Sequence, residues 1–167
     1  FWLLIQVKNK SNFNFFSQKK ISYFFYFLFS LLFIQIIMGA FVSGLDAGRI
    51  YQTWPMMGGS YLPDDLNIKS INFILDFNNH SLVQFYHRNL AYLIIVYSIY
   101  LAIYIYKNKL SNLYSPFKIL LFFLFVQISL GIFTLISGLN IFLASMHQIT
   151  SVFLVFSAIN LYYFRAK

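Results

Sequence analysis

Two histidines stand inside long apolar stretches of the chain, at matching positions. His87 lies five residues after Leu82, where one stretch begins, and His147 lies five residues after Phe142, where another begins. Ionisable side chains are costly at membrane depth, so they usually mark a functional site or a buried partner. Two helices running in the same direction, with a rise of about 1.5 Å per residue, would place both imidazoles about 7 to 8 Å below the helix starts. Two neutral imidazoles at one depth are what a six-coordinate haem iron needs.

Small residues follow each histidine along its predicted helix face. Positions four and eleven residues after a histidine share its face, and here they hold Ala91 and Ser98 in one stretch and Ser151 and Ala158 in the other. Gly39 and Gly131, in two further apolar stretches, could bring backbone close to the same ligand. A flat macrocycle needs such room beside its axial ligands. The alternative is that the small residues serve helix packing and that each histidine only forms hydrogen bonds in the core.

A zinc site is a weaker interpretation of the same residues. The chain has no cysteine, and no third or fourth histidine or carboxylate appears at the level of the two histidines, whereas zinc takes three or four protein ligands. His80 follows Asn78 and Asn79 and is predicted to lie in a loop outside the membrane. The sequence therefore favours His87 and His147 as ligands of haem iron.

Two arginines are candidates for contacts with the propionates of such a haem. Arg88 follows His87 directly and would point about 100° further around the helix. Arg49 lies in the loop predicted before that helix. Guanidinium groups pair well with carboxylates. For Arg88, an arginine that extends to lipid headgroups explains the position equally well, and both explanations stay open.

The elements that must position these residues are membrane helices. Of the 167 residues, 60% are hydrophobic and 10% are charged, which is typical of an integral membrane protein. A span needs about 20 apolar residues. Four stretches are long enough, at about 21–45, 82–106, 117–138 and 142–164. No short alternating strands appear, so the predicted fold class is an all-α membrane protein with a four-transmembrane-helix bundle.

The rest of the chain is predicted to form three kinds of segment. Residues 1–8 are predicted to be the tail of a preceding transmembrane helix, residues 9–20 a basic inner loop, and residues 21–167 a four-helix haem-binding bundle with an outer loop at 46–81. The outer loop contains "LDAGRIYQTWPMMGGSYLPDD", which favours an ordered cap at the membrane interface. An aromatic belt with turn residues is the alternative.

The charged residues predict an orientation rather than a nucleic-acid partner. The net charge is +8, but the basic residues cluster at the ends of the apolar stretches and not on one folded face. All four acidic residues fall in the predicted outer loop. By the positive-inside rule, both chain ends are expected on the cytoplasmic or matrix side.

A repeat relates the two halves of the predicted bundle. "QIIMGAFVSGL" at 35–45 is similar to "QISLGIFTLISGL" at 127–139, and each places a glycine four residues after a glutamine. Each of these segments precedes a helix that carries one of the histidines. The first two helices therefore look like a unit that is duplicated in the last two, and repeats of this kind often bind a ligand at their interface.

Four segments together resemble the C-terminal half of the haem A synthase family: "GAFVSGLDAGRIYQTWPMM", "VQFYHRNLAY", "QISLGIFTLISGL" and "ASMHQ". The resemblance implies one half of a duplicated eight-helix architecture, in which His87 and His147 hold a haem b. Members of this family oxidise a methyl group of haem O to the formyl group of haem A for cytochrome oxidase. The catalytic residues are expected in the N-terminal half, so this segment alone is expected to bind haem and not to turn over.

The resemblance also implies partners and a location. The candidate partners are haem O as substrate, haem O synthase, an electron acceptor, membrane lipid and a second copy of the chain in a homo-oligomer. The expected location is the bacterial plasma membrane or the mitochondrial inner membrane, because the cysteine-free chain is similar to the alphaproteobacterial and mitochondrial branch. Two other hypotheses are a bis-histidine cytochrome b electron carrier or anchor subunit, and a transporter or assembly factor with structural histidines.

Overall fold

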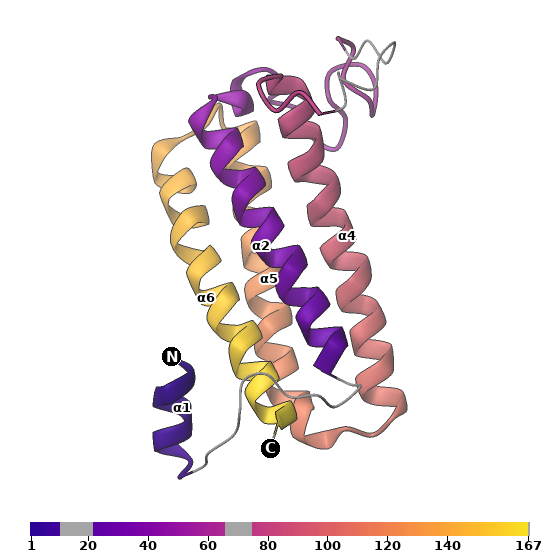
Figure 1. Cartoon of the computed structure of the whole chain (residues 1–167). Coiled ribbons are helices and arrows are strands. Elements are labelled where there is room, and N and C mark those ends of the chain that lie inside the picture. Colours follow the sequence, from indigo (N-terminus) through magenta and orange to yellow (C-terminus); the bar gives the residue numbers. More distant parts are fainter. Residues whose placement is uncertain (11–21, 66–74, 167) are drawn as a thin grey trace.

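The computed structural model describes residues 1–10, 22–65 and 75–166, and these form helices joined by turns and loops (Figure 1). The helices are α1 (Trp2–Lys8), α2 (Ser22–Gly44), η1 (Ala47–Arg49), α4 (His80–Lys107), η2 (Ser111–Leu113), α5 (Tyr114–Ile136) and α6 (Ile141–Ala166), where η marks a 3-10 helix. The four long ones are long and apolar enough to cross a membrane. The predicted class, an all-α membrane bundle, is confirmed, and most of the predicted inner loop at 9–20 lies outside the described residues.

The four long helices run alternately up and down and pack as two antiparallel pairs (Figure 1). One pair is α2 with α4, and the other is α5 with α6. Contacts between the pairs, α2 with α6 and α4 with α5, are sparser than contacts within them. The short helix α1 lies beside the lower half of α6, where Phe1 stacks on Phe156 at 4.7 Å between ring centroids. Each pair thus corresponds to one copy of the sequence repeat.

Asparagine side chains fix where the two histidine-bearing helices begin. Asn79 precedes α4, and its side-chain oxygen accepts a hydrogen bond from the Leu82 N–H at 2.9 Å. Asn140 precedes α6, and its side-chain oxygen accepts from the N–H groups of Phe142 at 3.0 Å and Leu143 at 3.3 Å. Such caps satisfy N–H groups that a helix start leaves unpaired. The sequence prediction, which used hydropathy alone, started the first of these helices two residues too late.

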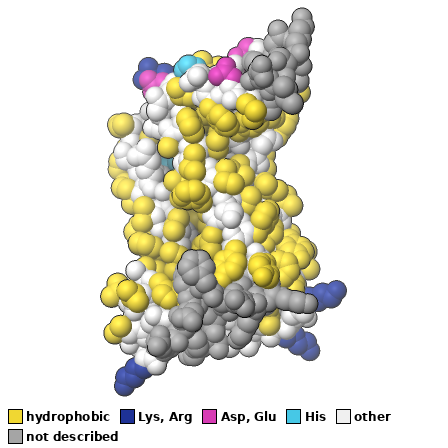
Figure 2. All heavy atoms as spheres, in the orientation of Figure 1, with side chains coloured by type: hydrophobic (Ala, Val, Ile, Leu, Met, Phe, Trp, Pro, Cys, Tyr) yellow, Lys and Arg dark blue, Asp and Glu magenta, His cyan; other side chains and the backbone are white. Residues whose placement is uncertain are grey.

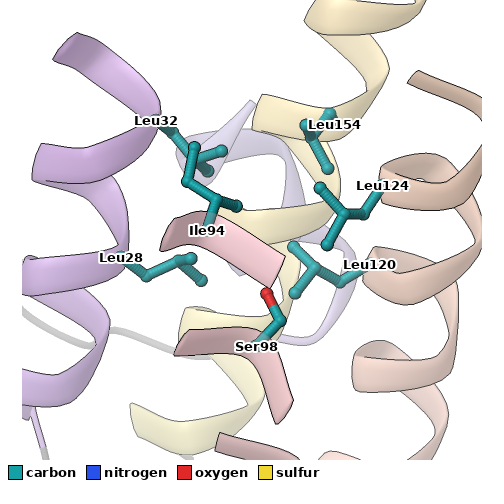
Figure 3. Close-up of a pocket in the computed structure, with 7 residues that line it drawn as sticks. All are labelled: Leu28, Leu32, Ile94, Ser98, Leu120, Leu124 and Leu154. Atoms are coloured by element: carbon teal, nitrogen blue, oxygen red, sulfur yellow. The ribbon is translucent and has the colours of Figure 1, made fainter. Parts of the chain in front are cut away.

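The tightest packing lies in the half of the bundle away from the outer loop. Figure 3 shows a layer to which all four long helices contribute, and the side chains that meet there are Leu28, Leu32, Ile94, Ser98, Leu120, Leu124 and Leu154. The gap that they surround has no volume for a water-sized sphere. Nearer the loop, residues 85–92, 126–132 and 143–147 are only partly buried. The interior at the level of the histidines is therefore less closed than the core below it.

The outer surface separates apolar sides from charged ends. Figure 2 shows hydrophobic side chains over the sides of the bundle, lysine and arginine at the end where α6 finishes, and aspartate together with some basic side chains at the opposite end. Lys107 ends α4 and Lys109 follows it at the basic end, whereas Asp46, Asp64 and Asp65 belong to the loop end. This separation matches the predicted charge pattern. The side of the membrane that each end faces stays a prediction.

Candidate functional site

Each histidine ring lies against a glycine of the helix paired with its own. A Cβ built on Gly39 of α2 would be 3.2 Å from Cε1 of His87, and one built on Gly131 of α5 would be 3.0 Å from Cε1 of His147. Any larger residue at either glycine would press on the imidazole, because both distances are at or near the lower limit for Cβ contacts. The glycines therefore set how closely each ring approaches its neighbouring helix.

A glutamine one helical turn before each glycine reaches the same ring. The amide nitrogen of Gln35 is 3.4 Å from Nε2 of His87, and the amide nitrogen of Gln127 is 3.3 Å from Nε2 of His147. Residues four apart share a helix face, so glutamine and glycine approach one imidazole together. The sequence repeat is therefore also a repeat of contacts. Both glutamines belong to the sequence repeat, but the repeat by itself did not predict their contacts with the histidines.

The hydrogen bonds of His147 define its tautomer. Its Nδ1 lies 3.0 Å from the backbone carbonyl oxygen of Gln127. A carbonyl only accepts, so Nδ1 of the neutral ring carries the proton and Nε2 carries the lone pair. The Gln127 amide then donates to Nε2. Thr150 completes the arrangement, since its hydroxyl is 2.5 Å from the Gln127 side-chain oxygen. This is the tautomer in which Nε2 can bind a metal.

His87 and Gln35, on the other helix pair, form fewer hydrogen bonds than His147 and Gln127 do. Nδ1 of His87 and the side-chain oxygen of Gln35 are both buried without a hydrogen-bond partner. An unpaired buried polar atom costs roughly 1 to 3 kcal/mol. Ser98, one of the small residues predicted to line the site, is also buried with an unpaired hydroxyl, but it lies in the closed core layer below the histidines. The unpaired polar atoms of His87 and Gln35 are typical of a site that is completed by a ligand.

The two histidines lie at similar distances from the starts of their helices. His87 comes seven residues after the start of α4, and His147 comes six residues after the start of α6. At about 1.5 Å per residue, each ring is about 9 to 11 Å along its helix. Both helices run away from the loop end (Figure 1). Their arrangement can supply one imidazole nitrogen from each helix pair to a metal held between the pairs.

Arg88 holds the outer loop onto α4. Its guanidinium donates to the backbone carbonyls of Thr53 at 2.8 Å, Tyr51 at 2.9 Å and Met56 at 3.2 Å. Gln84, one turn earlier on α4, donates to the same Tyr51 carbonyl at 2.9 Å. Neither sequence-based explanation for Arg88 included this role, because only the folded loop brings these carbonyls to the helix.

Further hydrogen bonds close the loop over the helix start. The Tyr51 hydroxyl donates to the Asp65 carboxylate at 2.9 Å, and the Ser81 hydroxyl donates to the other carboxylate oxygen at 2.7 Å. The Tyr61 hydroxyl donates to the Asn89 side-chain oxygen. Burial by itself would raise the pKa of Asp65, but the hydrogen bonds from Ser81 and Tyr51 outweigh it and lower that pKa below its usual value. Residues 51–65 thus form an ordered cap, as the loop composition predicted.

Arg49 and His80 lie apart from the two partly buried histidines. Arg49 forms an ion pair with Asp46 at 3.7 Å, and the two side chains are 69% and 68% exposed. His80 is exposed and is the first residue of α4, because the helix begins directly after the Asn79 cap. The prediction that His80 lies in a loop was therefore wrong. Within the described ranges, no three His, Cys, Asp or Glu residues are grouped to hold a metal ion, so nothing there supports a zinc site.

One family model and three relatives indicate what this chain is similar to. The family model COX15-CtaA, described as cytochrome oxidase assembly protein, matches residues 1–159. The chain is 39% identical over 160 residues to heme A synthase of Pelagibacter ubique (strain HTCC1062), which covers 94% of this chain and 45% of that protein. It is 41% identical over 128 residues to heme A synthase of Wolbachia pipientis wMel, covering 77% and 35% of the two chains.

A third relative, heme A synthase of Paracoccus denitrificans (strain Pd 1222), is 35% identical over 125 residues, covering 75% of this chain and 33% of that protein. The chain therefore spans less than half the length of these relatives. No solved structure matches it significantly.

Proposed function

The chain belongs to the COX15-CtaA family of cytochrome oxidase assembly proteins, and from this premise we propose that it is the haem b-binding half of a haem A synthase. The observation that carries the proposal is the repeated contact unit, in which a glutamine and a glycine of one helix meet the histidine of the next. The unit occurs once in each helix pair, so each pair offers one imidazole. Relatives named heme A synthase extend over twice this length, and the second half of the proposed eight-helix architecture would lie in that additional sequence.

We assign His87 and His147 as the axial ligands, each through Nε2. These donors fit a haem iron, because both are imidazoles and His147 carries its proton on Nδ1. Around the rings, the helix faces are only partly buried and some polar atoms are unpaired. A bound haem b would supply reversible one-electron transfer. The chain's own contribution would be to hold the rings against Gly39 and Gly131 and to set the protonation of His147.

Arg88 and Arg49 remain the proposed contacts for the propionates. Arg88 is the better placed of the two, because it is adjacent to His87, is partly buried and keeps its Nε free of hydrogen bonds. Arg49 is largely exposed beside Asp46 and would have to leave that ion pair. The cap that Arg88 holds would in either case cover the loop end of the site.

In the complete protein, the proposed role of this half is electron transfer. Conversion of a methyl group of haem O to the formyl group of haem A is an oxidation, so electrons must pass from the substrate to an acceptor. The haem held here would carry them. Substrate haem and the catalytic residues would belong to the other half, with haem O synthase and the acceptor as partners. We further propose that the basic end faces the cytoplasm or matrix.

The proposal is tested by loading the detergent-purified chain with haem b and recording its reduced-minus-oxidised visible spectrum. We expect a low-spin b-type spectrum that is lost in both His87→Ala and His147→Ala. The matched control is His80→Ala, because His80 is an exposed histidine of the same helix as His87. Absence of haem binding, or a spectrum equally insensitive to all three substitutions, would contradict the proposal and favour structural histidines.

A further inference from the structure

We propose that Gln35 and Gln127 are placeholders, which cover the ligating nitrogen of each histidine in the haem-free protein and must turn away before iron can bind. The inference rests on the proposed function and adds two positioning residues to it. Its basis is that both amides approach Nε2, at 3.4 Å and 3.3 Å, in both copies of the repeat. In the proposed site, Nε2 is the atom that the iron requires.

The competition follows from the chemistry of the imidazole ring. With Nδ1 of His147 donating to the Gln127 carbonyl, Nε2 has one lone pair in the ring plane and no proton. That lone pair accepts either an amide N–H or a bond to iron. The backbone carbonyl of Gln127 stays in place when its side chain moves, so the ring keeps its orientation and its tautomer while Nε2 is released.

The two placeholders are held with different strengths. The amide of Gln127 is fixed from both sides, because its oxygen is 2.5 Å from the Thr150 hydroxyl and its nitrogen is 3.3 Å from Nε2. The amide of Gln35 lacks the second contact, because its oxygen has no partner. We therefore expect the Gln35 side chain to turn away from its histidine more easily than the Gln127 side chain does.

A purely structural role for the glutamines predicts a different response to substitution. If Gln127 instead supports the ring in the haem-bound state, without blocking Nε2, its replacement by leucine would leave the haem affinity unchanged or weaken it. If Gln127 competes with iron, the same replacement removes the competitor but keeps the backbone carbonyl that orients the ring. The sign of the change in haem affinity therefore separates the two roles.

The experiment is a titration of the haem-free, detergent-purified chain with iron protoporphyrin IX. We expect Gln127→Leu to bind about 2- to 12-fold more tightly than the unsubstituted chain, which is the range for one net hydrogen bond. Thr150→Val should shift the affinity in the same direction by a smaller factor. Gln148→Leu is the matched control, because Gln148 is exposed on the same helix, and we expect it to leave the affinity unchanged.

A second readout needs no haem. In 15N spectra of the haem-free chain labelled at histidine, we expect the Nε2 resonance of His147 to shift in Gln127→Leu while Nδ1 stays protonated. An unshifted Nε2 resonance, or haem affinity in Gln127→Leu equal to or weaker than that of the unsubstituted chain, would overturn the placeholder role alone. Failure of the unsubstituted chain to bind haem would instead overturn the proposed function.

Discussion

At the scale of single residues, the site depends on two glycines, which have no side chain, as much as on the two histidines. Gly39 and Gly131 leave space that the imidazoles of His87 and His147 fill. A methyl group at either position would displace the ring or the helix, and such overpacking typically costs about 1 to 3 kcal/mol. The tighter contact is at Gly131, at 3.0 Å, so that position is the more sensitive one.

We therefore expect Gly131→Ala to lower haem retention after gel filtration more than Gly39→Ala does, and both to lower it more than Gly44→Ala. Gly44 is the matched control because it ends α2 and nothing lies within 4 Å of a Cβ built on it. In a helix, alanine is otherwise the more stable residue by about 0.5 to 1 kcal/mol. Equal retention in Gly131→Ala and Gly44→Ala would show that the ring does not need the space at Gly131.

At the scale of elements, the cap at residues 51–65 and helix α4 form one unit. Arg88 connects them through three carbonyls, and a hydrogen bond to a charged group contributes about 1.5 to 3 kcal/mol. We expect Arg88→Gln to increase hydrogen exchange at residues 51–56 of the haem-free chain and to lower its thermal stability. Arg49→Gln should change neither, because exposed ion pairs contribute about 0 to 1 kcal/mol. Equal effects of the two substitutions would contradict a specific role for Arg88.

The cap should also respond to acid through Asp65. Because hydrogen bonds lower the pKa of Asp65 in the folded protein, their stabilisation is fully present above the unfolded value of about 3.9 and is lost as pH falls below it. The protection factors of the amides in residues 51–65, which correct hydrogen exchange for its intrinsic pH dependence, should therefore be constant from about pH 8 to 5 and decrease at lower pH. Asp65→Asn should weaken this acid response, and Asp46→Asn, at a 68% exposed side chain, should preserve it. An unchanged acid response in Asp65→Asn would assign it to another group.

At the scale of the whole molecule, the bundle consists of two similar helix pairs, each of which contributes one histidine. Hydropathy alone predicted the four spans to within about three residues, because each is a long apolar stretch. The repeat and the spacing of the histidines predicted that each lies near the start of its helix, as it does in α4 and α6. The spans and the histidine positions both depend on local sequence, which explains why they could be predicted without a structure.

Other features depend on tertiary contacts and could not be predicted in the same way. The contacts of Gln35 and Gln127 with the histidines require knowledge of which helices pair and at what register. The bonds from Arg88 to the loop require the folded path of residues 51–56. The start of α4 at His80 depends on the Asn79 cap, a signal present in the sequence but weaker than the hydropathy pattern that was used.

The central claim is that His87 and His147 coordinate the same iron. The most direct measurement is the electron paramagnetic resonance spectrum of the oxidised, haem-loaded chain, compared with His87→Ala, His147→Ala and the control His80→Ala. We predict a low-spin ferric signal in the unsubstituted chain and the control, and a high-spin signal in each of the other two variants, because each keeps only one axial imidazole. A low-spin signal that persists in either His87→Ala or His147→Ala would contradict the claim.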